Sequence, residues 1–454
     1  MSGKSIVIIG AGLSGTLLAI RLAQRGFKVQ LHEKRADMRH VQMSAGRSIN
    51  MALSDRGIKA LKLIGMDEFM LNASIPMTGR MIHSPDGQTS LQPYSGRPGE
   101  YINSISRGGL NIGLLDKAES YENISLYFNS DCIDADTERG ICRFRNTDGT
   151  ISEVKADLFV GADGAGSALR NAFYKHSASL RFSFSQQFLT AGYKELHIPP
   201  GNEGGFLLEK NALHIWPRGR FMMIGLPNLD GSFTMTLFTD FDGENGFESL
   251  QAEDDVEKYF NKYFPDASAL MPDLKKDFFM NPTGSLGTVK CWPWQYGGKF
   301  ALLGDAAHAV VPFYGQGMNC SFEDCVVLDQ LIDQYGDDWP SILPKYQDAR
   351  KQNTDAIADL AVENFVEMRD LVADPVYIKK RQLETRLEFN YPDYFSKYSM
   401  VTFRADLPYS FAKEMGNKQN QLLMDICSTT SDISTLDTDA VMDQIRKLRE
   451  DRQE

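Results

Sequence analysis

Short apolar runs alternate with helical patterns at the start of the chain. Residues 5–9 are Ser-Ile-Val-Ile-Ile, a β-branched run typical of a strand buried on both faces of a parallel sheet. Residues 16–25 then follow a helical pattern that Gly26 ends, and residues 27–33 predict a second strand. This strand–helix–strand unit has the size expected of a dinucleotide-binding fold.

The pattern changes in two later blocks. Residues 76–98 carry strand-like pieces around Pro85-Asp86-Gly87, which indicates a hairpin. The block from about 180 to 285 predicts several strands with little helix between them. These strands span 188–198, 205–216, 220–227 and 232–239. Such a run of strands favours a separate antiparallel sheet.

Buried strands return at 157–160 and 300–303, a helix is predicted over 317–334, and the pattern is helical after about 340. We therefore predict an α/β fold: a dinucleotide-binding (Rossmann-like) domain, an inserted antiparallel-sheet domain that holds the substrate, and a C-terminal helical region. The predicted boundaries are 1–75, 99–180 and 286–340 for the nucleotide domain, 76–98 and 181–285 for the sheet domain, and 341–454 for the helical region.

Composition excludes several classes of protein. The 454 residues include 27 Phe and 17 Tyr and are 42% hydrophobic, which supplies a large core and excludes disorder as the main state. The net charge of −12 disfavours nucleic acid and anionic membranes as partners.

Cysteine and histidine spacing does not indicate a metal site. The six cysteines form no CxxC pair, and the seven histidines show no HxxxH or HExxH spacing. We expect reduced thiols in the core. No apolar stretch reaches the roughly 18 residues of a membrane span, and the N-terminus lacks the features of a signal peptide. We therefore expect a soluble, cytoplasmic protein without a membrane partner.

The first candidate motif is Gly10-Ala11-Gly12-Leu13-Ser14-Gly15. Its glycines allow a tight turn and close approach of a pyrophosphate, and the following helix offers N–H donors. Glu33 ends the second strand, where a carboxylate accepts hydrogen bonds from ribose hydroxyls. The alternative is a Gly-rich turn with a surface glutamate. Because strand, helix and acid occur together, the dinucleotide interpretation is favoured.

Two further motifs follow predicted strands. Asp163 lies in Gly161-Ala162-Asp163-Gly164, and Asp305 lies in Leu303-Gly304-Asp305-Ala306. Asp163 alone is interpreted as an Asp-Gly turn. Asp305 is a candidate acceptor for ribitol or ribose hydroxyls, a candidate helix N-cap, or both.

The three motifs together resemble those of the flavin-dependent aromatic hydroxylases. Their order and spacing match over residues 1–330. The resemblance implies tightly bound FAD and an NADPH that visits transiently, which explains the lack of a second GxGxxG.

Further segments resemble the kynurenine 3-monooxygenase family within this group. They span residues 46–53, 79–84, 213–218, 311–319, 364–369 and 398–403. The resemblance implies hydroxylation of L-kynurenine by dioxygen to 3-hydroxykynurenine through a flavin hydroperoxide, in tryptophan degradation towards quinolinate and NAD.

The resemblance also implies site residues. Those at the FAD are Leu13, Glu33, Arg35, Ala52, Arg107, Cys132, Asp163, Ala168, Asp305, Met318 and Asn319, together with the motif glycines Gly10, Gly12, Gly15 and Gly317. Those at the substrate are Arg80, Tyr94, Asn364 and Tyr398, with Phe313 and Met368 lining the aromatic pocket. No side chain is expected to act as a catalytic acid or base, because the flavin carries the chemistry.

The substrate set suits the chemistry of kynurenine. A carboxylate is best held by an arginine fork with hydroxyl and amide groups beside it. Each residue also has a structural interpretation: Arg80 as an exposed hairpin arginine, Asn364 as a helix–helix hydrogen bond, and the tyrosines and pocket residues as core.

Two other functions stay open at this point. One is a flavin hydroxylase of a simpler aromatic acid, and the other is an FAD-bound redox scaffold or sensor without turnover. Eukaryotic members of the family append a membrane helix, whereas residues 444–452 here are polar. We therefore expect no membrane anchor, and the sequence does not indicate an oligomeric state.

Overall fold

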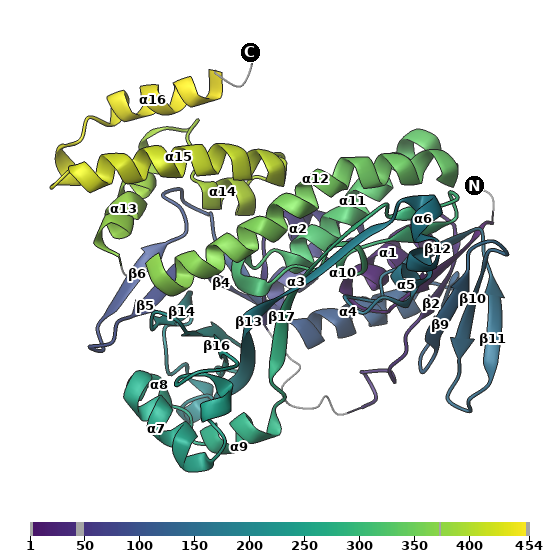
Figure 1. The fold of residues 1–454 in the computed structure, drawn as a ribbon, viewed down its shortest axis with the longest axis horizontal. Coiled ribbons are helices and arrows are strands. Elements are labelled where there is room, and N and C mark those ends of the chain that lie inside the picture. The colour runs from purple at the N-terminus through teal and green to yellow at the C-terminus, as the bar shows by residue number, and fades with distance from the viewer. Residues whose placement is uncertain (1–2, 42–49, 372–373, 451–454) are drawn as a thin grey trace.

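A computed structural model describes residues 3–41, 50–371 and 374–450. Figure 1 shows two sheet-containing parts joined by the long strands β13 and β17, with the C-terminal helices α13 to α16 gathered at one end. Segment 46–49 of the family resemblance lies outside the described residues.

The first part contains a parallel sheet of six strands in the order β18-β19-β12-β1-β2-β8. Its members are β1 (Ser5–Ile9), β2 (Lys28–His32), β8 (Ile124–Tyr127), β12 (Leu158–Gly161), β19 (Phe300–Leu302) and the short antiparallel β18 (Gln295–Tyr296). Residues 6–9 of β1 are at most 3% exposed, as expected of a strand covered on both faces. The helices α4 (Arg107–Glu119) and α11 (Gly317–Tyr335) both pack against α1 (Leu13–Gln24) here.

Two small sheets flank this core. One contains β3 (Asn50–Leu53), β7 (Ile102–Ser106) and β4 (Ser74–Met77), and the other is the meander β9 (Asp131–Asp136), β10 (Ile141–Arg145) and β11 (Ile151–Lys155). Short helices fill the connections. They are α2 (Asp55–Leu63), α3 (Asp67–Asn72), α5 (Ala168–Lys175), α6 (Ser177–Leu180) and α10 (Asp305–His308).

The second sheet has seven strands in the order β17-β13-β16-β15-β14-β5-β6. They are β17 (Gly284–Trp292), β13 (Ser183–Ile198), β16 (Phe233–Asp240), β15 (Met222–Pro227), β14 (Ala212–Pro217), β5 (Gly79–His83) and β6 (Thr89–Pro93). All neighbours are antiparallel except β14 and β5. The hairpin predicted around Pro85-Asp86-Gly87 is confirmed as β5–β6.

The second sheet differs from the prediction in three ways. β17 pairs with β13, so the sheet continues past residue 285, where the predicted boundary falls. The strand predicted over 205–216 starts only at Ala212, because the chain after the 3-10 turn Asn202–Gly204 continues through bends and a turn up to residue 211. The division of the chain into domains stays a prediction.

The third difference is a group of helices that the strand pattern missed. They are α7 (Glu253–Tyr263), α8 (Pro265–Ser268) and α9 (Leu274–Met280). α7 carries three acidic residues in its first turn and buries Val256, Tyr259 and Phe260, a helical spacing that is visible in the sequence.

The helical pattern after residue 340 is confirmed. Its elements are α12 (Trp339–Val366), the π-helical turn η4 (Glu367–Leu371), α13 (Pro375–Asn390), α14 (Lys397–Thr402), α15 (Tyr409–Thr429) and α16 (Thr438–Glu450). α12 packs on both α11 and α15 and so connects the parallel sheet to the C-terminal helices (Figure 1). Within the described ranges, no helix has both the length and the apolar character needed to cross a membrane.

Candidate active site

The turn between β1 and α1 is shaped by its glycines. Gly10 has φ +103°, and a Cβ there would lie 2.4 Å from the Ala162 carbonyl oxygen. A Cβ on Gly15 would lie 2.1 Å from the Gly10 oxygen, whereas a Cβ on Gly12 would meet nothing within 4 Å. The outer glycines therefore serve backbone packing, and Gly12 leaves the N-terminus of α1, which begins at Leu13, open to a ligand.

Glu33 directly follows β2 and is 7% exposed. Its Oε2 accepts a hydrogen bond from the Ala11 amide at 3.1 Å, and its Oε1 accepts one from the Arg35 Nε at 2.8 Å. Burial acts to raise the pKa of Glu33, but the hydrogen bonds and charge of Arg35 outweigh it and lower the pKa. A carboxylate is thus held beside the glycine turn, while the Arg35 side chain stays 61% exposed.

Cys132 lies in β9, next to the segment that carries Glu33 and Arg35. The Ser130 amide donates to the Glu33 carbonyl at 2.9 Å, and the Asn129 amide donates to the Arg35 carbonyl at 3.0 Å. The Cys132 side chain itself is buried against the core. The structure therefore brings the Cys132 strand, and not an exposed thiol, to the glutamate.

Asp163 combines a capping role with an unpaired oxygen. Its Oδ2 accepts from the Ala168 amide at 2.7 Å, which fixes the start of α5. Its Oδ1 is buried without a hydrogen-bond partner, and burial raises the pKa of the carboxyl. A local structural role of Asp163 thus accounts for Oδ2 only. Oδ1 is a buried acceptor that could receive a hydrogen bond from a ligand.

Asp305 is the first residue of α10 and is exposed. Gly304, with φ +61°, holds the N-cap position, so the N-cap role predicted for Asp305 is wrong. Protein atoms crowding the carboxyl raise the pKa of Asp305, and the charges of Arg107 and His308 oppose this rise. Arg107 is the exposed first residue of α4, and its positive charge therefore acts on the Asp305 carboxyl.

Asn319 fastens the start of α11 to β3. Its Oδ1 accepts from the Ser54 amide at 3.0 Å, and its Nδ2 donates to the carbonyls of Ala52 and Gly315 at 2.8 and 2.9 Å. The Asn319 side chain thus positions the loop, while Gly317 and Met318 begin the helix beside it.

These residues fit an FAD. Four of the groups follow β1, β2, β12 and β19, which are neighbours in the parallel sheet, so their carboxyl ends lie at one edge. The edge offers an open helix N-terminus, the paired Glu33 carboxylate, an unpaired Asp163 oxygen and the exposed Asp305. This donor and acceptor set suits a pyrophosphate with ribose and ribitol hydroxyls.

The predicted substrate residues meet on the other side of the α11 loop. Arg80 of β5 is 7% exposed, and its Nε is buried without a hydrogen-bond partner. Its guanidinium carbon lies 5.1 Å from the ring centroid of Tyr398 and 5.8 Å from that of Tyr94. The interpretation of Arg80 as an exposed hairpin arginine is therefore wrong.

Aromatic rings enclose the arginine. Tyr94 stacks on Tyr398 at 5.0 Å, Tyr398 stacks on Tyr314 at 5.7 Å, and the Tyr94 hydroxyl is buried without a partner. Asn364 donates from Nδ2 to the Phe313 carbonyl at 2.7 Å and contacts the Met368 sulfur at 3.3 Å. The structure thus brings all six predicted substrate residues into one cluster.

Glu367 is a member of this cluster that sequence reasoning missed. Its Oε1 lies 3.8 Å from the Arg80 NH1 and accepts from the Tyr377 hydroxyl at 2.5 Å. Burial acts to raise the pKa of Glu367, but Lys380, Lys397 and Arg80 lower it to about 2. The sequence carries no distinct signal for it, because Glu363 and Asp370 lie one helical turn before and after Glu367 and make it look like part of a charged face.

A buried charge network connects the two regions. Asp324 accepts from the Gly304 amide at 3.0 Å, His308 Nε2 at 2.7 Å and Arg350 Nε at 2.7 Å. Glu323 pairs with both Arg350 and Arg56, and Arg56 donates to the carbonyls of Arg404 and Leu407. The turn before Asp305 is thereby tied to the chain that follows Tyr398.

His308 is held as an imidazolium in this network. Burial lowers the pKa of His308, but the charge of Asp324 outweighs it and raises the pKa to about 10.

The motifs that contain Asp163 and Asp305 are also joined. Arg170 lies in α5, the helix after Asp163, and donates to the Ala306 carbonyl at 2.8 Å.

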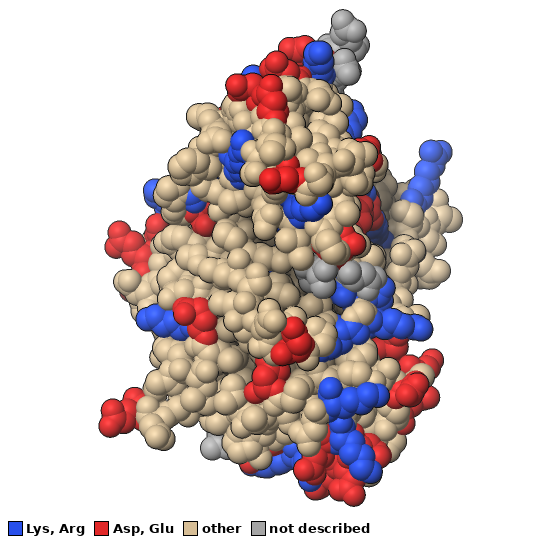
Figure 2. Space-filling view, turned by 90° about the vertical axis from the view of Figure 1, so that its left-hand side faces the viewer, with Lys and Arg blue, Asp and Glu red and all other residues tan. Residues whose placement is uncertain are grey.

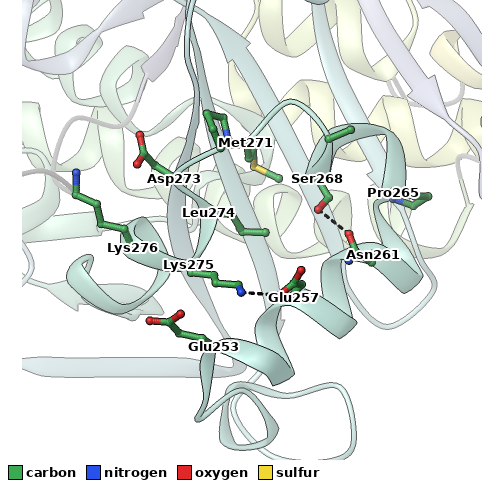
Figure 3. A pocket seen from close by; sticks show the side chains of 12 residues that line it. Glu253, Glu257, Asn261, Pro265, Ser268, Met271, Asp273, Leu274, Lys275 and Lys276 are labelled. Atoms are coloured by element: carbon green, nitrogen blue, oxygen red, sulfur yellow. Dashed lines mark hydrogen bonds and ion pairs between the residues drawn. The ribbon is translucent and has the colours of Figure 1, made fainter.

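A separate surface pocket of about 610 Å³ lies among α7, α8 and α9. Figure 3 shows its walls, where Lys275 pairs with Glu257 and Ser268 bonds to Asn261. Its lining contains none of the predicted site residues.

The face drawn in Figure 2 carries acidic and basic side chains side by side, so charge of neither sign alone covers it.

Comparison with known proteins first defines the class. A family model described as "FAD binding domain" matches residues 4–361. The solved structure of 2-methyl-3-hydroxypyridine-5-carboxylic acid oxygenase shares the fold, with a TM-score of 0.67, 21% identity and coverage of 85% of this chain and 98% of that one. The fold class and the FAD cofactor predicted from the sequence are confirmed.

Two curated relatives then define the family. The kynurenine 3-monooxygenase of Myxococcus xanthus is 47% identical over 414 residues, covering 91% of this chain and 88% of the relative. That of Dictyostelium discoideum is 44% identical over 458 residues, covering 98% of both. The chain therefore belongs to the kynurenine 3-monooxygenase family, as the resemblance predicted.

Proposed function

We propose that this chain uses FAD, NADPH and dioxygen to hydroxylate L-kynurenine to 3-hydroxykynurenine. The observation that carries the proposal is Arg80, a buried guanidinium with an unpaired Nε inside a cage of tyrosines. A buried arginine without a full set of acceptors is suited to receive a carboxylate from a ligand. The family relatives supply the substrate class.

The cofactor would lie along the edge of the parallel sheet. Gly12 and Leu13 would hold the pyrophosphate on the turn that Gly10 and Gly15 shape, and Glu33 with Arg35 and Cys132 would hold the adenosine half. The remaining positions would hold the ribityl chain and flavin ring: Ala52, Arg107, Asp163, Ala168, Asp305, Gly317, Met318 and Asn319. Bound there, FAD supplies the oxygen chemistry that side chains do not provide.

The protein residues would bind, orient and shield the substrate. Arg80 would pair with the carboxylate, with Tyr94, Asn364 and Tyr398 as helpers, and Phe313 and Met368 would pack on the aromatic ring. The Arg80–Glu367 distance of 3.8 Å is too long for a hydrogen bond, so the Arg80 guanidinium keeps N–H donors for an incoming carboxylate. Fixing the ring and excluding water are the main contributions expected of such a site.

The test is NADPH oxidation by the purified flavoprotein with and without L-kynurenine, with the product identified by mass. We expect strong stimulation and a product one oxygen heavier. Stimulation without that product would make kynurenine an effector only. No stimulation with flavin bound would redirect the search to other aromatic acids.

We also propose a cytoplasmic location, as part of tryptophan degradation. The support is that all six cysteines are free thiols, as expected in a reducing compartment. Fractionation of cells with antibody detection tests the proposal, and recovery outside the cytoplasmic fraction would contradict it.

A further inference from the structure

Two segments that carry the family resemblance, 79–84 and 213–218, each contain a buried histidine that no role above uses. His83 is the last residue of β5, and His214 lies within β14. We propose that His83, His214 and Asp266 of α8 are positioning residues that hold Arg80 in place for the substrate. This inference rests on the substrate role proposed for Arg80.

The three side chains form one hydrogen-bonded chain. His83 Nδ1 lies 3.0 Å from Asp266 Oδ2, and His83 Nε2 lies 2.8 Å from His214 Nδ1. At the far end, His214 Nε2 lies 2.8 Å from the Glu209 carbonyl oxygen. Trp216 donates to the same Asp266 oxygen at 2.8 Å and stacks on His83 at 3.9 Å.

The geometry fixes how many protons the chain holds. Both ends are oxygen acceptors, so each terminal ring nitrogen carries a proton, and the central contact between two nitrogens needs a third. Two neutral imidazoles carry only two protons in total. The pair therefore holds three, and Asp266 balances the extra positive charge.

Asp266 supplies the negative charge at the His83 end of the hydrogen-bonded chain. Burial acts to raise the pKa of Asp266, but the hydrogen bonds of His83 and Trp216 lower it to about 2, so the carboxyl is ionised. Burial lowers the pKa of His214 to about 4, which makes His214 the neutral ring. The other facing charges are Arg218, which donates to the His83 carbonyl at 2.9 Å, and Glu209 beside His214.

The hydrogen-bonded chain of His83, His214 and Asp266 supports β5 where the backbone pairing that holds Arg80 is weakest. β5 joins the sheet through its pairing with β14, over residues 79–82 against 212–215, and β6 lies beyond it at the sheet edge. His83 is the first residue past this short ladder, and its side chain extends the link to β14 and α8. Arg80 lies on β5 and Tyr94 directly follows β6, so both depend on this link.

The first test compares two variants and a control. His83→Gln breaks the chain, Asp266→Asn keeps its size but removes the charge, and His197→Gln changes an exposed histidine of β13 in the same sheet. For the first two we expect KM for L-kynurenine to rise about tenfold, by analogy with the roughly 10–100-fold effects of residues that orient metal ligands. We expect kcat and FAD content to stay near wild type, and the control to be unchanged.

Two outcomes overturn the inference alone, and a third overturns the proposed function on which it rests. If Arg80→Lys raises KM but His83→Gln and Asp266→Asn do not, the positioning role is wrong while the substrate role stands. If KM, kcat and FAD content all change together, the chain serves general stability only. If the wild-type protein does not turn over kynurenine at all, the proposed function itself fails.

A second readout is independent of activity. Imidazole N–H signals of ¹⁵N-histidine-labelled holoenzyme, assigned with the His83→Gln variant, count the protons on the pair. We expect three N–H protons across His83 and His214. Two protons would contradict the hydrogen-bonded chain.

Discussion

The edge of the parallel sheet that would bind FAD (the cofactor edge) and the residues around Arg80 (the substrate cluster) hold charged groups in different ways. At the edge, Glu33 is satisfied by residues near it in sequence, and Asp305 and Arg35 reach solvent. In the cluster, Arg80 and Glu367 are mostly enclosed and come from segments far apart in the chain. The exposed charges at the edge are therefore screened by water and the buried Glu33 is paired locally, whereas the charges in the cluster depend on partners from distant segments.

The largest effect is expected where the two regions meet. Asp324→Asn would remove the buried counter-ion of His308 and one of the two carboxylates that pair with Arg350, at a cost of about 3–5 kcal/mol in the free energy of unfolding. Because the pKa of His308 is raised from 6.5 to about 10, its pairing stabilises the fold below pH 6.5, and this contribution is lost as pH rises towards 10. Urea unfolding at several pH values measures both effects.

The matched control is Asp333→Asn, which removes an exposed carboxylate from the same helix. We expect the wild-type protein and this control to lose stability between pH 6.5 and 10. Asp324→Asn should lose much less over that range. Parallel curves for all three proteins would show that the His308–Asp324 pair is not what connects the regions.

The next effect isolates the substrate cluster. Arg80→Ala removes the proposed carboxylate ligand and a counter-ion of Glu367, and we expect kcat/KM for L-kynurenine to fall about a hundredfold, or about 3 kcal/mol. Arg80→Lys should fall in between, since it keeps the charge but not the fork. FAD content should not change in either variant. A parallel loss of FAD would show that the two regions are not separable.

The third effect separates the packing role of Gly15 from the ligand-binding role of Gly12 at the cofactor edge. Gly15→Ala places a Cβ 2.1 Å from the Gly10 oxygen, so we expect a loss of about 2 kcal/mol in stability, measured by thermal unfolding. Gly12→Ala meets no protein atom and should leave the stability of FAD-free protein unchanged while weakening FAD binding. Equal unfolding temperatures for the two FAD-free variants would contradict this division.

The smallest effect is expected at Glu33. Glu33→Gln keeps the shape but removes the charge, and we expect FAD affinity to fall about tenfold, or about 1.4 kcal/mol. Glu138→Gln, at an exposed position after β9, is the control. Fluorescence titration of flavin measures both, and an effect as large as that of Arg80→Ala would contradict the contrast between locally paired and distantly paired charges.

The contrast also explains what the sequence predicts. Gly10, Gly15 and Glu33 follow local strand–helix–strand spacing, so the cofactor edge is visible in one stretch of chain. Arg80 looks like a hairpin arginine in isolation, because Tyr398, which encloses it together with Tyr94, lies far away in sequence. Glu367 was missed for the same reason, since its partners are Arg80, Tyr377 and two lysines on other elements.

The most direct test of the substrate cluster uses two ligands and one variant. L-kynurenine and its decarboxylated analogue kynuramine share the ring and differ in the carboxylate that Arg80 is proposed to hold. We expect the wild-type holoenzyme to prefer L-kynurenine strongly in kcat/KM, and Arg80→Ala to lose most of that preference. Equal preference in the wild-type and variant proteins would contradict the assignment of Arg80 as the carboxylate ligand.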